Sequence, residues 1–591
     1  MKKSCFQVLV SSVILAWGGA LLAAQAAPPP STGGFFPLDQ VRAGMKATAW
    51  TVFRGVDPEP MDVEILGVLR GARGPGQDMI LAQLHGAKPE YTGVVAGMSG
   101  SPVYADGKLL GALSYRIGQF SRDPIAGITP IAQMLEVRDL PLRDLAGKEI
   151  SVTAASAAGL NLQPMETPLV LSGFNPEAVR FWQQTMAGTG LEQVVAGGSG
   201  ASEQAAEGQT EDRIVPGSAV SMQLVRGDVE MAATCTVTYI DPKQLLACGH
   251  PVLQAGTISL PMTASVVVAT LASPLNAFKI INTGRTIGAF TEDRNSAIRG
   301  VLGAKARMIP LSLEMAGGRT LHAEILDQEG LTPQVAMAVL YQALQESNRS
   351  HAEASYHLTG RIRLGKESDV PVDQWAVSAE GAPAQMSAAL AVGDLFQRLY
   401  ASGERTSAVL GIELRVEQMD ERAQLELEQV RLLGTDSVHA GDTVTLAAML
   451  RPWRQEPHAV QLAVQLPARL QAGVVRLLVS DSGTLDRLTD PPLPPGQTRP
   501  WKTLLAASRQ RHAANRLYAS LLLPEADATV DGQELSSLPL SVVNVLERPT
   551  AAHPEILSGE TPQTVVEIPT AGPVTGFQVI SLRILPGAGL N

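Results

Sequence analysis

The chain has few of the residues that mark nucleic-acid-binding, zinc-binding or membrane-spanning proteins. Its 591 residues include three cysteines, nine histidines and 4% aromatic residues, and 57 acidic residues outnumber 46 basic ones. A net charge of −11 leaves no basic footprint for phosphates, and three cysteines are too few for a CxxC-type zinc site. After the first 26 residues, no apolar run reaches the ~18 residues that a membrane span needs. We therefore expect no nucleic-acid partner, no metal or other cofactor, and no integral membrane segment.

The first 26 residues have the three parts of a secretory signal. Lys2 and Lys3 form a basic start, an apolar stretch covers residues 6–23, and a small-x-small cleavage site ends at Ala26. The sequence therefore predicts a signal peptide at 1–26 and a periplasmic or secreted mature protein. In such a compartment a disulfide between the two remaining cysteines is permitted.

The rest of the chain is rich in glycine, proline and short apolar runs, which indicates a mainly β protein with a few connecting helices. Asp106-Gly107 between two apolar runs predicts a two-residue hairpin. Strict alternation, as at Ile412, Leu414 and Val416, predicts an immunoglobulin-like β-sandwich in the second half. We expect a β domain at 36–310 with a polar insert near 190–212, a mixed strand and helix connector at 311–403, the sandwich at 404–546, and a Pro-rich tail at 547–591.

Residues 93–115, GVVAGMSGSPVYADGKLLGALSY, break an apolar run at a serine between glycines. A nucleophile elbow, G-x-S-x-G, does not fit, because Ser101 replaces its last glycine and a hairpin follows instead of a helix. The serine loop of β-barrel peptidases fits better, because its tight turn aims backbone N–H groups at the developing oxyanion. Ser99 would then be the nucleophile, with the N–H groups of Gly97 and Ser99 as the oxyanion hole. A glycine-rich turn without chemistry is the alternative.

A nucleophilic serine needs a base, and two histidines are candidates. His250 lies in LLACGHPV, between a glycine and a proline at the end of an apolar run, and His85 lies close to Ser99 in sequence. A histidine in such a turn is also common without any catalytic role. The remaining histidines lie in exposed-looking or late segments and are set aside.

Two segments together resemble a known family. GMSGSPVYADGKLLGALSY (97–115) is similar to the nucleophile region of the stage IV sporulation protein B (SpoIVB) peptidases, and CTVTYIDPKQLLACGHP (235–251) is similar to their histidine region. The resemblance covers residues 36–135 and 216–310 and implies a trypsin-like double β-barrel. In that family the histidine half comes first, so the halves are permuted here.

The resemblance implies an exported serine endopeptidase acting on protein or peptide substrates, with Ser99 as nucleophile and His250 as base. The family's acidic triad position matches His85 here, so the acid is open between Asp78, the nearest carboxylate, Asp241, Asp293 and none. This substitution motivates the rival interpretation, a catalytically inactive peptidase fold that serves as a binding or scaffolding protein of the cell envelope. The oligomeric state is left open.

The two late cysteines lie on strand-like runs that flank the turn-prone pair Asp241-Pro242. A turn centred on this pair would place Cys235 directly opposite Cys248, close enough to form a disulfide. Two small buried residues that merely face each other are the alternative. A bridge here would stiffen the strand end that carries His250.

Overall fold

The computed structural model describes most of the chain after the expected signal peptide. The polar insert near 190–212 falls mostly outside the described residues, and residues 1–26 fall entirely outside them. The structure describes residues 33–586 except 118–122, 142–161, 166, 168, 192, 196–197, 200–213, 274–276, 348–352, 380–381, 401–404, 406, 491–499, 524–525, 531–532, 539–541, 543–555 and 559–560.

Six antiparallel strands close into a first β-barrel. Each strand pairs with the next in the order β4-β1-β2-β3-β6-β5, and β5 pairs back onto β4. Closure leaves no unpaired edge among these six strands. The expected hairpin at Asp106-Gly107 is confirmed, because Ala105 pairs with Lys108. The strands are β1 (Lys46–Thr51), β2 (Glu59–Leu69), β3 (Met79–His85), β4 (Pro102–Ala105), β5 (Lys108–Ile117) and β6 (Ile125–Pro130).

A second barrel repeats this strand order. Its strands pair in the order β14-β11-β12-β13-β16-β15, and β15 pairs back onto β14. The strands are β11 (Ala219–Gly227), β12 (Glu230–Asp241), β13 (Gln244–Ala247), β14 (Gly256–Leu271), β15 (Phe278–Arg294) and β16 (Ala297–Leu302). The expected double β-barrel is thus confirmed.

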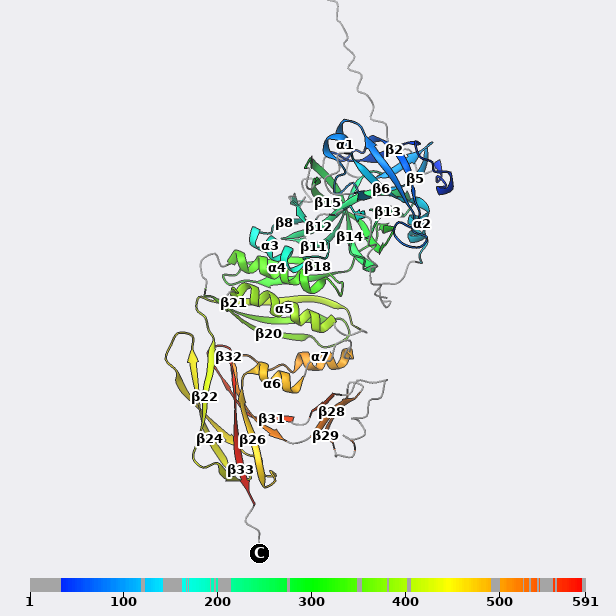
Figure 1. The fold of residues 1–591 in the computed structure, drawn as a ribbon. Coiled ribbons are helices and arrows are strands. Elements are labelled where there is room, and N and C mark those ends of the chain that lie inside the picture. The colour runs from blue at the N-terminus through cyan, green and yellow to red at the C-terminus, as the bar shows by residue number, and fades with distance from the viewer. Residues whose placement is uncertain are drawn as a thin grey trace, which may run out of the picture.

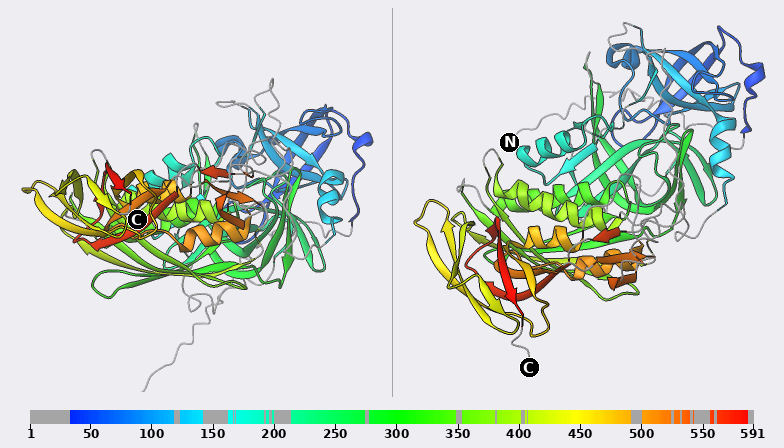
Figure 2. Two further views of the ribbon diagram at one scale, coloured as in Figure 1. Left: turned by 90° about the horizontal axis from the view of Figure 1, so that it is seen from below. Right: turned by 60° about the horizontal axis from the view of Figure 1, so that its bottom comes forward.

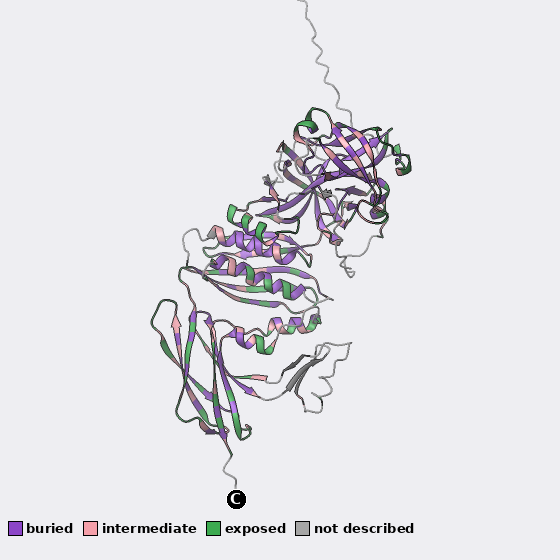
Figure 3. Cartoon of the chain, in the orientation of Figure 1, coloured by how far each residue is buried: buried purple, intermediate pink, exposed green. Residues whose placement is uncertain are grey.

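The two barrels pack against each other through side chains and backbone. Trp50 and Tyr104 of the first barrel share a buried cluster with Leu246 and Ala297 of the second. The long strands β14 and β15 also reach past their own barrel, and Gly55 forms a bridge with β14. Figure 3 shows buried residues along most of the barrel strands, whereas the strands at the other end of the molecule alternate between buried and exposed.

The large sheet continues beyond the second barrel into a layer covered by helices. Figure 1 shows α4 and α5 lying between the barrels and the C-terminal strands. The region expected as a connector at 311–403 therefore extends the sheet of the second barrel. Its elements are β17 (Met308–Glu314), β18 (Thr320–Leu326), α4 (Thr332–Ser347), β19 (Ser355–Leu364), β20 (Val370–Val377), α5 (Ala384–Tyr400) and β21 (Val409–Met419).

A β-sandwich of a four-stranded and a five-stranded sheet forms the other end of the molecule, as both views in Figure 2 show. The expected sandwich is confirmed, but its strands begin at Leu425 and continue to Leu585. The region expected to be a tail supplies β31, β32 and β33, which pair with β27, β22 and β26 respectively. The strands are β22 (Leu425–Leu433), β23 (Ser437–His439), β24 (Thr443–Pro452), β25 (His458–Gln465), β26 (Gly473–Ser480), β27 (Arg516–Leu523), β31 (Thr561–Pro569), β32 (Val574–Thr575) and β33 (Phe577–Leu585).

Shorter elements connect or cover these units. They are η2 (Leu38–Gln40), α1 (Ala87–Thr92), α2 (Ile131–Arg138), β7 (Leu162–Pro164), β8 (Leu169–Ser172), α3 (Pro176–Thr185), β9 (Val194–Val195), β10 (Gly198–Ser199), α6 (Ser482–Thr489), α7 (Trp501–Arg509), β28 (Ala526–Val530), β29 (Gln533–Leu538) and β30 (Ile556–Ser558). None of the helices in the described part of the chain has the length and hydrophobicity of a membrane span.

Candidate active site

The serine segment forms a tight loop between the third and fourth strands of the first barrel. Gly97 and Gly100 have φ of 92° and 93°, a conformation that side chains with a Cβ rarely adopt. The loop is fixed from within, because the Ser101 backbone N–H and hydroxyl both donate to the Met98 carbonyl. The Gly100 N–H donates to the Leu113 carbonyl at 2.7 Å. These bonds hold Ser99 at the top of the loop.

The serine loop lies directly on the second barrel. The Thr236 N–H donates to the Ser99 carbonyl at 2.7 Å, and the Thr236 hydroxyl donates to the Gly97 carbonyl at 3.0 Å. The Thr238 hydroxyl donates to the Gly100 carbonyl at 2.7 Å. A Cβ at Gly100 would lie 2.5 Å from the Cys248 nitrogen. The loop thus contacts the backbone two residues before His250.

The histidine segment is a second tight turn, between the third and fourth strands of the second barrel. Cys248 and Gly249 both have positive φ, 66° and 73°. The Cys248 N–H donates to the Thr236 carbonyl, and the Thr129 hydroxyl of the first barrel donates to the Gly249 carbonyl. Because Thr236 bonds to both segments, the fold places the serine and histidine turns side by side.

A disulfide joins Cys235 to Cys248, with a Cα–Cα distance of 5.3 Å. The expected direct opposition of these cysteines is wrong, because Asp241 pairs with Gln244 and the turn lies one residue further along. An irregularity near Tyr239 then places Thr236, rather than Cys235, opposite Cys248. The bridge is therefore diagonal across the hairpin.

Removing this disulfide should destabilise the protein. We expect replacement of both Cys235 and Cys248 by alanine to lower the free energy of unfolding by about 3 kcal/mol, the chain-entropy value for a loop of roughly 15 residues. Urea unfolding measures the loss, with the reduced parent chain as a control. Thiol titration of the unfolded, unreduced chain without residues 1–26 should find no free thiol. Two free thiols per chain would contradict the bridge.

The His250 side chain is buried, with one ring nitrogen free. Nδ1 lies 2.7 Å from the Pro251 carbonyl oxygen. Since a carbonyl only accepts, Nδ1 carries the proton and Nε2 has the lone pair of a neutral imidazole. Burial lowers the pKa of His250 to about 4, the Pro251 hydrogen bond opposes this, and the nearby Arg73 guanidinium lowers it further. His250 is therefore an unprotonated base at neutral pH.

Two side chains beside His250 were not expected from the sequence. The Tyr115 ring meets the imidazole edge to face, with centroids 6.4 Å apart. Arg73, from the loop between β2 and β3, donates to the Tyr115 hydroxyl at 3.1 Å and to the Asn295 carbonyl of the second barrel at 3.2 Å. Tyr115 ends the segment 97–115 that resembles the SpoIVB nucleophile region, whereas Arg73 lies in no motif. Both lie far from His250 in sequence, so only the fold places them beside it.

The three candidate acids occupy different places, and none of them bonds to the imidazole in the described structure. The Asp78 carboxylate binds the Arg70 guanidinium and the Gly71 N–H, which lower its pKa. Asp241 ends β12 at the hairpin turn and pairs with Gln244, the first residue of β13, at the end of the hairpin away from His250. Asp293 is the acid that reaches the histidine segment.

The buried Asp293 carboxylate binds the backbone just after His250. Its two oxygens accept hydrogen bonds from the N–H groups of Val252 at 3.0 Å and Leu253 at 2.6 Å. Burial raises the pKa of Asp293 to about 6, although these N–H groups favour its ionised form. Asp293 therefore fixes the loop that carries His250, rather than the imidazole itself.

The atoms expected to act on a substrate have free hydrogen-bonding capacity. Ser99 Oγ and His250 Nε2 are both buried and, within the described residues, neither has a hydrogen-bond partner. They therefore do not bond to each other in this structure. The N–H groups of Gly97 and Ser99 likewise have no acceptor in the described part of the chain. The serine loop thus carries an unsatisfied hydroxyl and two unsatisfied amides, and the histidine turn beside it carries an unsatisfied imidazole nitrogen.

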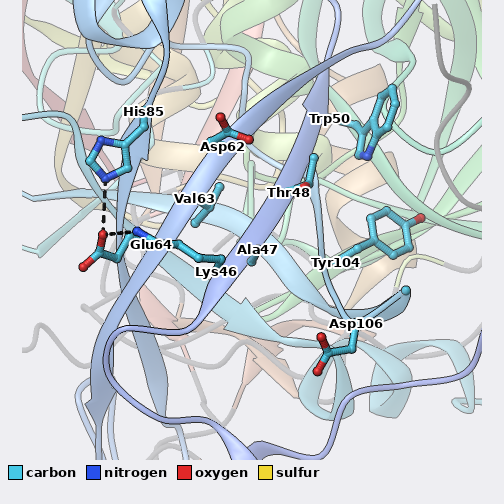
Figure 4. A pocket seen from close by; sticks show the side chains of 11 residues that line it. Lys46, Ala47, Thr48, Trp50, Asp62, Val63, Glu64, His85, Tyr104 and Asp106 are labelled. Carbon is cyan, nitrogen blue, oxygen red and sulfur yellow. Dashed lines mark hydrogen bonds and ion pairs between the residues drawn. The ribbon is translucent and has the colours of Figure 1, made fainter.

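His85, the second candidate base, lies elsewhere. Figure 4 shows it at a groove on the outside of the first barrel, pointing toward Glu64, which also binds Lys46. The His85 Nε2 is 3.8 Å from the Glu64 carboxylate, and Nδ1 is 3.7 Å from Glu90. His85 is therefore engaged with surface carboxylates. Among the described residues, no group of three or more His, Cys, Asp or Glu side chains is arranged to hold a metal.

A comparison with protein families matches the first barrel. Residues 37–135 match the family described as SpoIVB peptidase S55, a range that includes the serine loop and ends before the second barrel. Searches of curated proteins and of solved structures found no significant match. The match indicates a peptidase. Over residues 37–135 the chain is therefore similar to the SpoIVB peptidase S55 family.

Proposed function

We propose that this protein is an exported serine endopeptidase that cleaves peptide bonds of protein substrates through Ser99 and His250. The contact between the two turns is the observation that supports this most. Ser99 and Cys248 both bond to Thr236, and Cys248 is two residues from His250. The serine and histidine halves are then permuted relative to the SpoIVB family. This permutation does not affect catalysis, because a catalytic site depends on the geometry of its side chains and not on their order along the chain.

The free atoms around the serine loop suit acyl transfer. Ser99 Oγ forms a bond to the carbonyl carbon of the scissile peptide, and its proton passes to His250 Nε2. The N–H groups of Gly97 and Ser99 donate to the resulting oxyanion. The imidazolium then protonates the leaving nitrogen as the C–N bond breaks, and water attacks the acyl-enzyme by the same steps in reverse.

The orientation of His250 comes from backbone rather than from a carboxylate. The Pro251 carbonyl accepts a hydrogen bond from the Nδ1–H group and so selects the tautomer with a free Nε2. Asp293 supports this indirectly by binding Val252 and Leu253. Catalytic hydrogen bonds are often long before substrate binds, so the missing bond between Ser99 and His250 is compatible with this role. Because both side chains are buried, substrate entry requires the segments over them to move.

The disulfide agrees with export. Disulfides persist in oxidising compartments, and Cys235 and Cys248 are bridged here. Together with the signal peptide predicted at 1–26, this supports a periplasmic or secreted location.

A fluorophosphonate probe tests the proposal, because it reacts covalently with an activated serine. We expect the mature protein to be labelled and Ser99→Ala to abolish the labelling. Ser480→Ala is the matched control and should still be labelled. Ser480 is likewise buried and, among the described residues, its hydroxyl has no hydrogen-bond partner, but it lies at the end of β26 in the β-sandwich. A folded parent chain that is not labelled, or labelling that persists in Ser99→Ala, would disprove the proposed nucleophile.

A further inference from the structure

A buried lysine from the second barrel lies beneath the serine loop. Lys279, at the start of β15, is 2% exposed. The backbone N–H of Lys279 donates to the Ala96 carbonyl at 3.2 Å, and the backbone N–H of Ala96 donates to the Ala277 carbonyl at 2.8 Å. A Cβ at Gly97 would lie 3.3 Å from Lys279 Cδ, so the lysine stem covers the α-carbon of Gly97.

The amine of Lys279 has a hydroxyl partner but no counter-charge. Nζ donates to the buried Thr51 hydroxyl at 2.7 Å. Within the described residues, Lys279 forms no ion pair, and burial lowers its pKa to about 7. Burying an ammonium group without an anion is costly. An anion that forms close to this amine would therefore stabilise its charged form.

Charged groups on the neighbouring elements do not supply such a negative charge. The serine loop at 93–101 and β14 contain no charged residue, and Lys46 is the only one in β1. Glu59, opposite Thr51 in β2, is ion-paired with Lys88. Glu230, which meets β15 at Thr283, also binds Gln223.

We propose that Lys279 is a positioning residue of the oxyanion hole, whose stem holds Gly97 in place and whose buried amine places a positive charge beneath the loop at which the tetrahedral oxyanion forms. This inference rests on the proposed function, because the oxyanion that forms at the Gly97 and Ser99 amides would be the missing counter-charge. A charge near a dry, preorganised site stabilises a developing anion far more than it would in water.

This role predicts that the pH–rate profile of Ser99 modification has an alkaline limb, a fall in rate at high pH. The ammonium form supports the oxyanion, so the rate of Ser99 modification should fall as the pH rises through about 7, where Lys279 loses its proton. With a base that is active above about pH 4, the profile should be bell-shaped. Lys279→Met should remove the alkaline limb and lower the rate at pH 6 roughly tenfold to a hundredfold.

The experiment measures the rate constant of fluorophosphonate labelling from pH 4 to pH 10. Lys305→Met, at an exposed lysine, is the control and should keep the parent profile. Thr51→Val keeps the lysine and its contact with Gly97 but removes the partner of the ammonium, so it should move the alkaline limb to lower pH. This second variant tests the inference even if Lys279→Met does not fold.

Two results would overturn the inference. Labelling by Lys279→Met with the parent rate and profile, or an alkaline limb that Thr51→Val does not move, would show that Lys279 has no role at the oxyanion hole. In both cases the proposed function would stand. Absence of labelling in the parent chain would overturn the proposed function together with this inference.

Discussion

Replacing Gly100 by alanine should destabilise the protein by more than about 4 kcal/mol and abolish labelling of Ser99. The new Cβ would lie 2.0 Å from the Thr236 carbonyl oxygen and 2.5 Å from the Cys248 nitrogen, both backbone atoms that cannot turn aside. The positive φ of 93° adds strain. Losses above 4 kcal/mol arise from a few mechanisms, of which overpacking is one. Urea unfolding of the mature chain measures the effect.

Substitution of a second glycine serves as a control that separates the cost of the steric clash from the cost of the backbone strain. Gly76 also has a positive φ, 73°, but a Cβ there would meet nothing within 4 Å. Gly76→Ala should therefore cost only about 1–2 kcal/mol, the strain of the left-handed conformation. Equal losses in the two variants would show that the serine loop does not press on the turn that carries His250.

The local sequence predicts the two turns of the site because each needs unusual residues. Gly97 and Gly100 adopt conformations that disfavour side chains, and Asp106-Gly107 forms the expected hairpin. Alternation of apolar residues likewise reveals the strands, since β21 buries Ile412, Leu414 and Val416. These signals act over a few residues and so can be read along the chain.

Features of the site that depend on the pairing of strands far apart in sequence could not be predicted. The choice of Asp293 over Asp78 depends on the pairing of β15 with β14, which brings its carboxylate to Val252. Which residue lies opposite Cys248 depends on a register shift in β12, and no residue type in the sequence indicates that shift. Lys279 looks like an ordinary surface lysine in sequence, and only the contact of β15 with the serine loop buries it.

Loss of His250 should have the largest effect on activity. His250→Ala removes the base that takes the Ser99 proton, and such a change costs on the order of 10⁶ in kcat in a serine peptidase. Fluorophosphonate labelling should become undetectable while the variant remains folded, as judged by circular dichroism. Labelling at the parent rate in His250→Ala would show that another group is the base.

The pH dependence of the parent chain tests the burial of His250 more finely. The neutral imidazole is the active base and its pKa is lowered from 6.5 to about 4, so on the acid side of the profile the rate should begin to fall only as the pH drops through about 4. At pH 5 the imidazole is still mostly neutral, and labelling should be roughly thirty-fold faster than with an unshifted histidine. Between pH 6.5 and 4 the unfolded chain binds a proton at His250 that the folded chain does not, so stability should decrease as the pH falls through this window. His250→Gln should remove this part of the acid destabilisation, and an acid limb near pH 6.5 in the parent chain would contradict the buried, neutral base.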